Sequence, residues 1–468
     1  MYDLLLKGAH VVDPLNGVNG VNDVAVEGGK IAAVGPDLTG PAREVIDVSG
    51  WVLQPGIIDS HVHLGSMWGS PYGPRMLAMN GVTTCLDMAG PLDDILEKTP
   101  QYGAGLNTAI LQFASPPFTF KTNAPSKAEM VELIDKSLAE GALGAKLLGG
   151  HYPLTPEVSS TLIKTALERR AYVAWHAGTS AHGSNLEGMI EAVQMADGYP
   201  LHLAHINAYC RGAIKNEIDE ARTAIELLNA NPNIFSESYI SPKNGTRLTC
   251  GPDGKIQSKV TGNCLRHFGF TEDRDGVRKA LLAHKAFAVY DAGGYSDLMT
   301  GEDAVKLWES HNTDVGGSFN INPPIPRILL AQVKRPDGAF VVDAISTDGG
   351  CIPRNVILSQ GLSLVKLDVL TLAEFAQKTS LNPARMLRLT AKGHLSVGAD
   401  ADITIYDYAT QTPKMSFVEG RKVLFKGEVL GKNANIICTE RGQKAIEARG
   451  LKAIVVDPGL PVDRVKAL

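Results

Sequence analysis

Two histidines, His61 and His63, follow an apolar run that begins at Trp51 and contains the dipeptide Pro55-Gly56. If this run is a β-strand, both imidazoles point to the same side, because side chains alternate faces along a strand. Two ring nitrogens at the rigid end of one strand can bind a single metal ion. The spacing therefore predicts a metal site at this strand end. The alternative is two surface histidines that are neighbours by chance.

Four further polar residues end short apolar runs in the same way: Lys146, His176, His205 and Asp348. Each one alone has an ordinary explanation, such as a lysine whose stem is buried, a hydrogen-bonded core histidine or a turn aspartate. Their shared position at strand ends is difficult to attribute to chance. Barrel enzymes place catalytic groups at the carboxyl ends of their strands, so we expect all six side chains to meet in one site.

Three other histidines lie close to these positions along the chain. His202 precedes His205 by three residues, so the two side chains point to opposite faces of a strand, and we expect His205 to be the ligand. His151 and His182 lie in loops that follow strands. We expect them to be surface residues, with contact to a substrate as the second reading.

The strands that would position these groups alternate with helical stretches such as 127–140 and 159–170. This alternation favours a parallel sheet, and eight strands within about 340 residues favour a (β/α)8 barrel with insertions. Residues 241–317 are long for one connection. They are expected to form a flap, or to hold a strand at 286–290 that competes for the seventh place. Besides the run before His61, the predicted strands are 81–88, 107–113, 143–148, 172–176, 201–205, 234–239 and 340–347.

Both chain ends consist of short β-prone runs. Gly28-Gly29 separates two of them, which is typical of a hairpin, and residues 401–407 alternate apolar and polar side chains. We therefore predict an α/β protein: a distorted barrel over residues 54–392 and one small β-sandwich domain formed by residues 1–53 and 393–468.

The composition is that of an ordinary globular protein. Of 468 residues, 44% are hydrophobic and 20% charged, and the net charge of −5 with no basic run gives no indication of nucleic-acid binding. The amino terminus does not resemble a secretory signal, and no apolar run approaches the roughly 18 residues of a membrane span. The six scattered cysteines indicate reduced thiols. We expect a cytoplasmic protein that acts on a small molecule, without nucleic-acid or membrane partners, as a homodimer or homotetramer.

These features together resemble the amidohydrolase superfamily over nearly the whole chain. The order His-x-His, Lys, His, His, Asp matches, as do Gln54–His63, Asn382-Pro383-Ala384-Arg385 and Gly398-Ala399-Asp400-Ala401-Asp402. Lys146 resembles the carboxylated lysine of the hydantoinase and dihydroorotase branch. The dipeptide Pro323-Pro324 after Asn322, and the segment Ser236-Glu237-Ser238-Tyr239, also resemble elements of that branch.

The resemblance implies two divalent cations, with Zn²⁺ expected and Mn²⁺ or Co²⁺ as alternatives. His61, His63 and Asp348 would hold one ion, and His176 and His205 the other. A lysine shielded by apolar residues has a lowered pKa, so Lys146 can take up CO2 as a carbamate that bridges both ions. The bridging water ionises near neutral pH and attacks, while Asp348 takes its proton and passes it to the leaving nitrogen.

The sequence also departs from the family. Dihydroorotase-like chains carry an arginine shortly after His-x-His, whereas Leu64-Gly65-Ser66-Met67-Trp68 follows His63 here, so dihydroorotate is disfavoured. Asn322 and Tyr152 are candidate substrate contacts, and Tyr152 resembles the hydantoinase tyrosine that polarises the scissile carbonyl. Arg354 could bind an anionic group or be simply solvated. Trp68, Tyr72 and Trp175 indicate a partly apolar substrate.

Four functions remain open. The first is hydrolysis of an amide-type C–N bond in a cyclic ureide or imide. The second is deacylation of N-acyl amino acids, or cleavage of dipeptides, on the same scaffold. The third is deamination, which usually needs one metal and no bridging lysine, so Lys146 counts against it. The fourth is a non-enzymatic scaffold, and retention of every ligand counts against that.

Overall fold

The larger part of the computed structural model, which describes residues 1–462 and 464, is a curled parallel sheet. Each strand is an apolar run that is buried almost throughout, as expected where helices cover a parallel sheet. All eight barrel strands lie where the sequence predicted them. They are β6 (Ile57–His63), β7 (Val82–Ala89), β8 (Ala104–Ala114), β9 (Gly144–Leu148), β10 (Tyr172–His176), β11 (Leu201–Leu203), β12 (Ile234–Tyr239) and β17 (Ala344–Ser346).

The barrel closes through a break in its eighth strand. β17 pairs with β12, and its continuation β18 (Gly349–Gly350) pairs with β6 on the other side. Between them Asp348 takes a left-handed conformation, with a φ of 52°, and its N–H donates to the carbonyl of His61 at 2.8 Å. A Cβ on Gly350 would lie 2.4 Å from the carbonyl oxygen of His63, so this close approach requires glycine. The break therefore places Asp348 beside the two histidines of β6.

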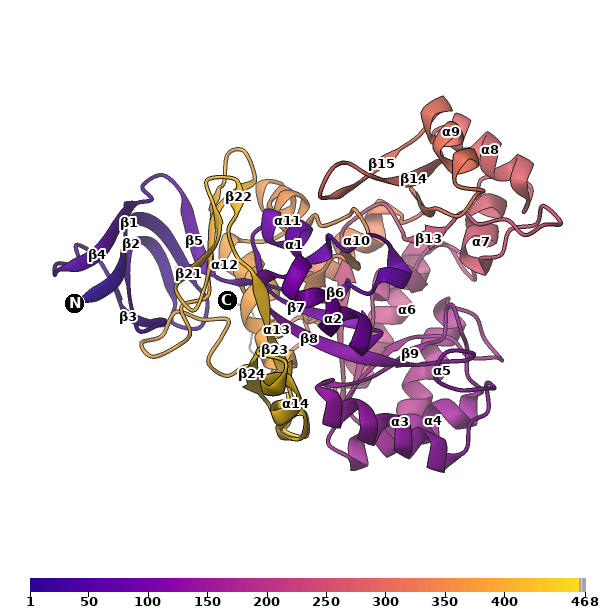
Figure 1. Ribbon diagram of the computed structural model, residues 1–468, viewed down its shortest axis with the longest axis horizontal. Coiled ribbons are helices and arrows are strands. Elements are labelled where there is room, and N and C mark those ends of the chain that lie inside the picture. The colour runs from indigo at the N-terminus through magenta and orange to yellow at the C-terminus, as the bar shows by residue number, and fades with distance from the viewer. Residues whose placement is uncertain (463, 465–468) are drawn as a thin grey trace.

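Helices connect and cover the strands (Figure 1). Local sequence explains their ends: α3, for example, begins at a capping box formed by Ser126 and Glu129 and ends at the left-handed Gly141. Those between barrel strands are α1 (Gly73–Met79), α2 (Leu92–Tyr102), α3 (Lys127–Glu140), α4 (Pro156–Glu168), α5 (Leu186–Ala196), η2 (Ile206–Tyr209), α6 (Glu217–Ala230) and α10 (Pro324–Gln332). After β18 come α11 (Ile357–Lys366), α12 (Leu372–Ala376), the π-helix η3 (Gln377–Leu381) and α13 (Asn382–Met386).

The two chain ends form a second, nine-stranded sheet. Its two halves are joined where β5 pairs with β19, so the strands form one continuous hydrogen-bonded sheet. Leu4, Val24, Leu53, Ile403 and Phe417 from both halves share its apolar core. The strands are β1 (Tyr2–Asp13), β2 (Val18–Glu27), β3 (Lys30–Gly35), β4 (Ala42–Asp47), β5 (Val52–Pro55), β19 (Ile403–Asp407), β20 (Thr412–Val418), β21 (Arg421–Phe425) and β22 (Glu428–Val429).

The end of the chain differs from the predicted division. β23 (Asn433–Cys438) pairs in parallel with β8 of the barrel sheet, and β24 (Lys452–Val455) pairs with β23. The helix α14 (Gln443–Ala448) connects the two strands. This segment therefore extends the larger sheet, whereas the sequence predicted it in the small domain.

Residues 241–322 form a separate lobe after β12, at the upper right of Figure 1. Its four-stranded sheet contains β14, so the strand at 286–290 does not compete for a place in the barrel. The lobe has its own apolar core, with Trp308 and Phe319 at its centre. Its elements are β13 (Thr246–Arg247), α7 (Lys259–His267), α8 (Arg274–Leu282), β14 (Ala286–Asp291), β15 (Ser296–Met299), α9 (Glu302–Ser310) and β16 (Gly316–Phe319). Across the described residues, no helix combines the length and apolar character needed to cross a bilayer.

Candidate metal centre and active site

One large pocket lies at the carboxyl ends of the barrel strands, with a volume of about 740 Å³. The structure places all six predicted ligands in its wall, together with two of the three predicted substrate contacts. The lobe contributes the opposite wall through α7 and β13. The predicted residues that line the pocket are His61, His63, Lys146, Tyr152, His176, His205, Asp348 and Arg354.

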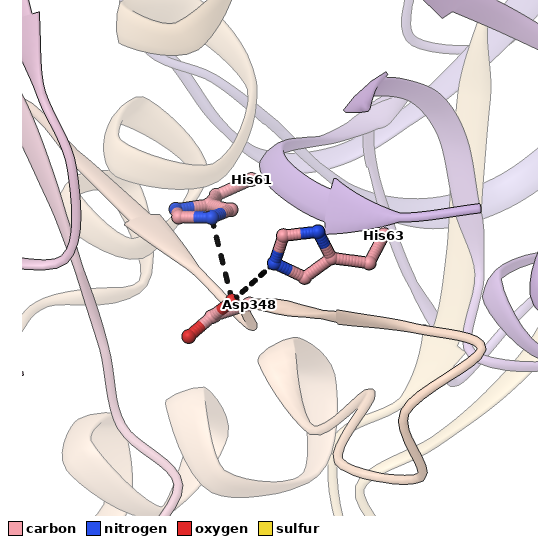
Figure 2. Close-up of side chains that lie close together, drawn as sticks. All are labelled: His61, His63 and Asp348. Carbon is pink, nitrogen blue, oxygen red and sulfur yellow. Dashed lines mark hydrogen bonds and ion pairs between the residues drawn. The ribbon is translucent and has the colours of Figure 1, made fainter. Parts of the chain in front are cut away.

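His61, His63 and Asp348 converge on one point (Figure 2). One carboxylate oxygen, Oδ1 of Asp348, lies 2.9 Å from Nε2 of His63 and 3.3 Å from Nε2 of His61. One potential ligand atom from each side chain lies within 4.8 Å of the others. The other ring nitrogen of His61, Nδ1, lies 2.6 Å from Oε1 of Glu237. A carboxylate behind a histidine fixes the ring and leaves the other nitrogen free for a metal, so this donor set fits a divalent cation.

His176 and His205 form a second pair of facing nitrogens. Nδ1 of His176 lies 3.0 Å from Nε2 of His205, and the far nitrogen of His176 lies 2.7 Å from Oγ of Ser184. Burial lowers the pKa of both imidazoles, so the rings are neutral at pH 7, which is the form that binds metals. A Cβ at Gly150 would lie 2.0 Å from Nε2 of His176, so a glycine is needed there. The pair fits a second cation beside the first.

Lys146 lies on β9 between these two sets and is fully buried. Its Nζ lies 3.0 Å from Sδ of Met88, and no carboxylate of the described residues lies within ion-pair distance of it. Burial lowers the pKa of Lys146 to about 8, although Glu237 and Asp348 oppose this shift. A permanently charged amine is costly in such a place, whereas a neutral amine can react with CO2. The surroundings therefore fit a carboxylated lysine.

Glu237 connects three parts of the site. Its Oε1 accepts the N–H of His205 at 2.6 Å in addition to its contact with His61, and its other oxygen accepts the hydroxyl of Ser346. The residue is completely buried on β12. The sequence marked this segment by its resemblance to the family but assigned Glu237 no role. An acid in the middle of a buried strand was the available signal.

Arg354 differs from both readings that the sequence left open. Only 4% of it is exposed, and it forms an ion pair with Asp348, with Nη2 to Oδ2 at 2.7 Å and Nε to the carbonyl oxygen at 2.6 Å. Burial alone would raise the pKa of Asp348, but Arg354 and His61 hold it well below its ordinary value. The arginine is therefore not solvated, and its charge is already paired within the protein.

Of the other two predicted substrate contacts, one lines the pocket and one does not. Tyr152 lines the pocket, and its ring lies 5.1 Å from that of Phe118. Asn322 does not line the pocket; its amide donates to the carbonyl oxygens of Ser241 and Lys243 and so joins the two ends of the lobe.

Of the three aromatic residues, only Trp68 lines the pocket, where its ring lies 4.7 Å from that of His63. Trp175 is fully buried in the core, and Tyr72 instead donates to Asp291 of the lobe. Trp175 and Tyr72 therefore give no support to the expectation of a partly apolar substrate, and among the three only Trp68 supports it.

The three remaining histidines differ in their position relative to the pocket. His151 is partly exposed and lines the pocket, and burial lowers its pKa to about 4, so its position favours the second reading, contact with a substrate. His182 is half exposed and lies 3.0 Å from Glu191, outside the pocket wall. His202 is fully buried, with Nδ1 2.8 Å from the hydroxyl of Tyr172, and it does not line the pocket.

Comparison with known proteins agrees with this architecture. The sequence pattern described as "Amidohydrolase family" matches residues 363–430. A dihydroorotase of Geobacter metallireducens is 24% identical over 86% of this chain and 90% of its own length. An allantoinase of Deinococcus radiodurans is 26% identical over 94% of this chain and 98% of its own length. A crystal structure of D-aminoacylase superposes with a TM-score of 0.66 and 18% identity, covering 93% of this chain and 99% of that one.

The barrel, the strand-end residues and these similarities point to one class of protein. The chain is similar to the amidohydrolases over nearly its whole length, and the comparisons support the branch that contains the hydantoinases and dihydroorotases. The comparisons support a hydrolase that acts on C–N bonds other than peptide bonds.

Proposed function

We propose that the protein is a binuclear hydrolase that opens an amide-type C–N bond in a cyclic ureide or imide. The observation that carries the proposal is the convergence of six potential ligands from five barrel strands on one pocket. The allantoinase and dihydroorotase relatives, whose names denote enzymes of cyclic ureides, support this substrate class.

His61, His63 and Asp348 would hold one ion, His176 and His205 the other, and a carbamate on Lys146 would bridge them. We expect zinc, with manganese or cobalt as alternatives, because imidazole and carboxylate ligands suit these ions. Bound divalent ions supply Lewis acidity and make water acidic enough to ionise near neutral pH.

Asp348 is positioned to act as the proton carrier. Its Oδ2 is held by Arg354, and its Oδ1 faces the two histidines, so the carboxylate is ionised and has one defined orientation. It would take the proton of the attacking water and deliver it to the leaving nitrogen. Tyr152, in the pocket wall, would donate its hydroxyl to the scissile carbonyl.

A second candidate is hydrolysis of a linear N-acyl amino acid or dipeptide. The pocket of about 740 Å³ is far larger than a bare five- or six-membered ring requires, so the substrate carries a substituent or is an extended amide. Deamination is disfavoured, because it does not use a buried bridging lysine.

The test is to supply the metal-loaded protein with hydantoins and dihydropyrimidines, N-acyl amino acids, dipeptides and aminopurines. Ring opening is followed by ultraviolet absorbance, acid release by pH-stat and deamination by ammonia assay. We expect turnover of cyclic ureides and its loss in Asp348→Asn. Ammonia release alone, or equal turnover by Asp348→Asn, would contradict the proposal.

A further inference from the structure

The charged residues of the pocket are strongly biased in sign. Besides Lys146, five cationic side chains line it among the described residues and Asp348 is its only acid, although the chain as a whole has a net charge of −5. Such a wall concentrates anions. The cations are Arg211, Arg247, Lys259, Arg266 and Arg354.

Most of these cations already have an assigned partner or role. Arg354 is paired with Asp348, Arg266 with Glu272 and Arg247 with Asp314. Lys146 belongs to the metal centre. Arg211 and Lys259 have no carboxylate partner within the part of the chain that the structure describes, and Lys259 is exposed on the first turn of α7.

Arg211 is held in place by neutral groups. Its Nε donates to Oδ1 of Asn322 at 2.8 Å, and its Nη2 donates to the hydroxyl of Tyr239 at 2.8 Å. The ring of Tyr239 lies 6.2 Å from that of His205, so this guanidinium is on the His205 side of the centre. Its third nitrogen, Nη1, has no acceptor among the described residues. A partly buried, preorganised cation without a counter-ion is a binding group for an anion.

The opposite side of the centre is apolar. Trp68 packs against His63, and Met67, Leu148 and Tyr152 continue the pocket wall next to it. The His63 side and the His205 side of the centre therefore differ in chemistry.

We propose that Arg211 binds a carboxylate of the substrate and that the Trp68 side receives an apolar group, so the scissile C–N bond lies between the two. This inference rests on the proposed function and narrows its substrates to amides or ureides that carry both groups. It also assigns the carboxylate to the loop after β11, since the residues directly after His63, 64–68, contain no arginine.

The test uses probes without a C–N bond, so its result does not depend on catalysis. Calorimetry compares ω-phenylalkanoates of two to six methylenes with the corresponding alcohols on metal-loaded protein. We expect at least one acid to bind about tenfold or more tightly than its alcohol in the wild type. Arg211→Gln should remove this preference and leave alcohol binding within about twofold.

Arg266→Gln is the matched control, because it removes a lining arginine that is already paired with Glu272. It should keep the preference. If Arg211→Gln does not fold, Arg211→Lys replaces it; a lysine ammonium lacks the planar fork by which a guanidinium holds Asn322 and Tyr239 and still presents a nitrogen to a carboxylate, so the preference should fall several-fold.

Two outcomes overturn the inference: no acid preferred over its alcohol in the wild type, or a full preference in the folded Arg211 variant, which would place the carboxylate on the metal centre. Failure of every substrate in the hydrolysis assay, with an intact Arg211-dependent preference, would instead contradict the proposed function.

Discussion

The guanidinium of Arg354 lies 2.7 Å from Oδ2 of Asp348, and the other oxygen of that carboxylate lies 2.9 Å from Nε2 of His63. Asp348 is therefore held at both oxygens and kept ionised. One oxygen is fixed by the arginine, which leaves the other to serve the metal centre.

Asp348→Asn should keep most of the metal and lose kcat by about 10²-fold or more, because the amide can ligate but cannot accept a proton. The loss should fall on kcat rather than KM, since proton transfer belongs to the transition state. Steady-state kinetics on metal-assayed protein measures both.

Asp343→Asn is the control for that experiment. Asp343 is a second buried acid at the opposite end of β17, where it accepts the N–H of Ser236 at 2.9 Å. Its loss should lower stability without a comparable loss of kcat. Full kcat in Asp348→Asn would show that another residue carries the proton, and His151 would be the next candidate.

Lys146→Ala should remove the bridging group and with it most of the activity and at least one metal ion per chain. Short carboxylic acids should restore part of the activity by occupying the vacated space. Metal content and turnover close to those of the wild type would show that Lys146 only fills the core.

Glu237→Gln should weaken the site without removing any ligand. The amide retains an acceptor for the N–H of His205 but cannot accept from both that group and His61 with the strength of a carboxylate. Loss of such a supporting partner typically lowers metal affinity about 10- to 100-fold. Competition with a fluorescent chelator measures this, and an unchanged affinity would show that Glu237 does not orient the ligands.

Lys378, which lies outside the metal centre, predicts how the stability of the fold depends on pH. It is fully buried on η3, donates to the carbonyl of Val342 at 2.6 Å, and burial lowers its pKa from 10.5 to about 7. Between these values the unfolded chain binds a proton that the folded protein does not, so the stability rises with pH across this window.

Lys378→Met should therefore raise the free energy of unfolding by roughly 3 kcal/mol at pH 7, after allowing for the lost hydrogen bond. The gain should disappear near pH 10.5, while metal content and turnover stay unchanged. Thermal unfolding at several pH values tests this. A gain that does not vary with pH would show that the pKa of Lys378 is the same in the folded and the unfolded state.

The barrel was predictable from the sequence because strands buried on both faces are continuous apolar runs, and the site residues stand at their ends. β23 could not be placed in the same way, since its short β-prone run resembles those of the small domain and only its pairing with β8 distinguishes it. Glu237 contacts His205, 32 residues away along the chain, and His61, 176 residues away. Arg211 contacts Asn322, 111 residues away, and Arg354 contacts Asp348, 6 residues away. Such pairings leave no pattern that the sequence alone reveals.

The central claim is a binuclear centre built from His61, His63, Lys146, His176, His205 and Asp348. Elemental analysis of protein purified without chelator, with the chain concentration fixed by amino-acid analysis, tests it most directly. The arrangement predicts two divalent ions per chain in the active protein, and loss of both ions together with the activity after chelation. A reproducible content of one ion or fewer per chain in fully active protein would contradict it.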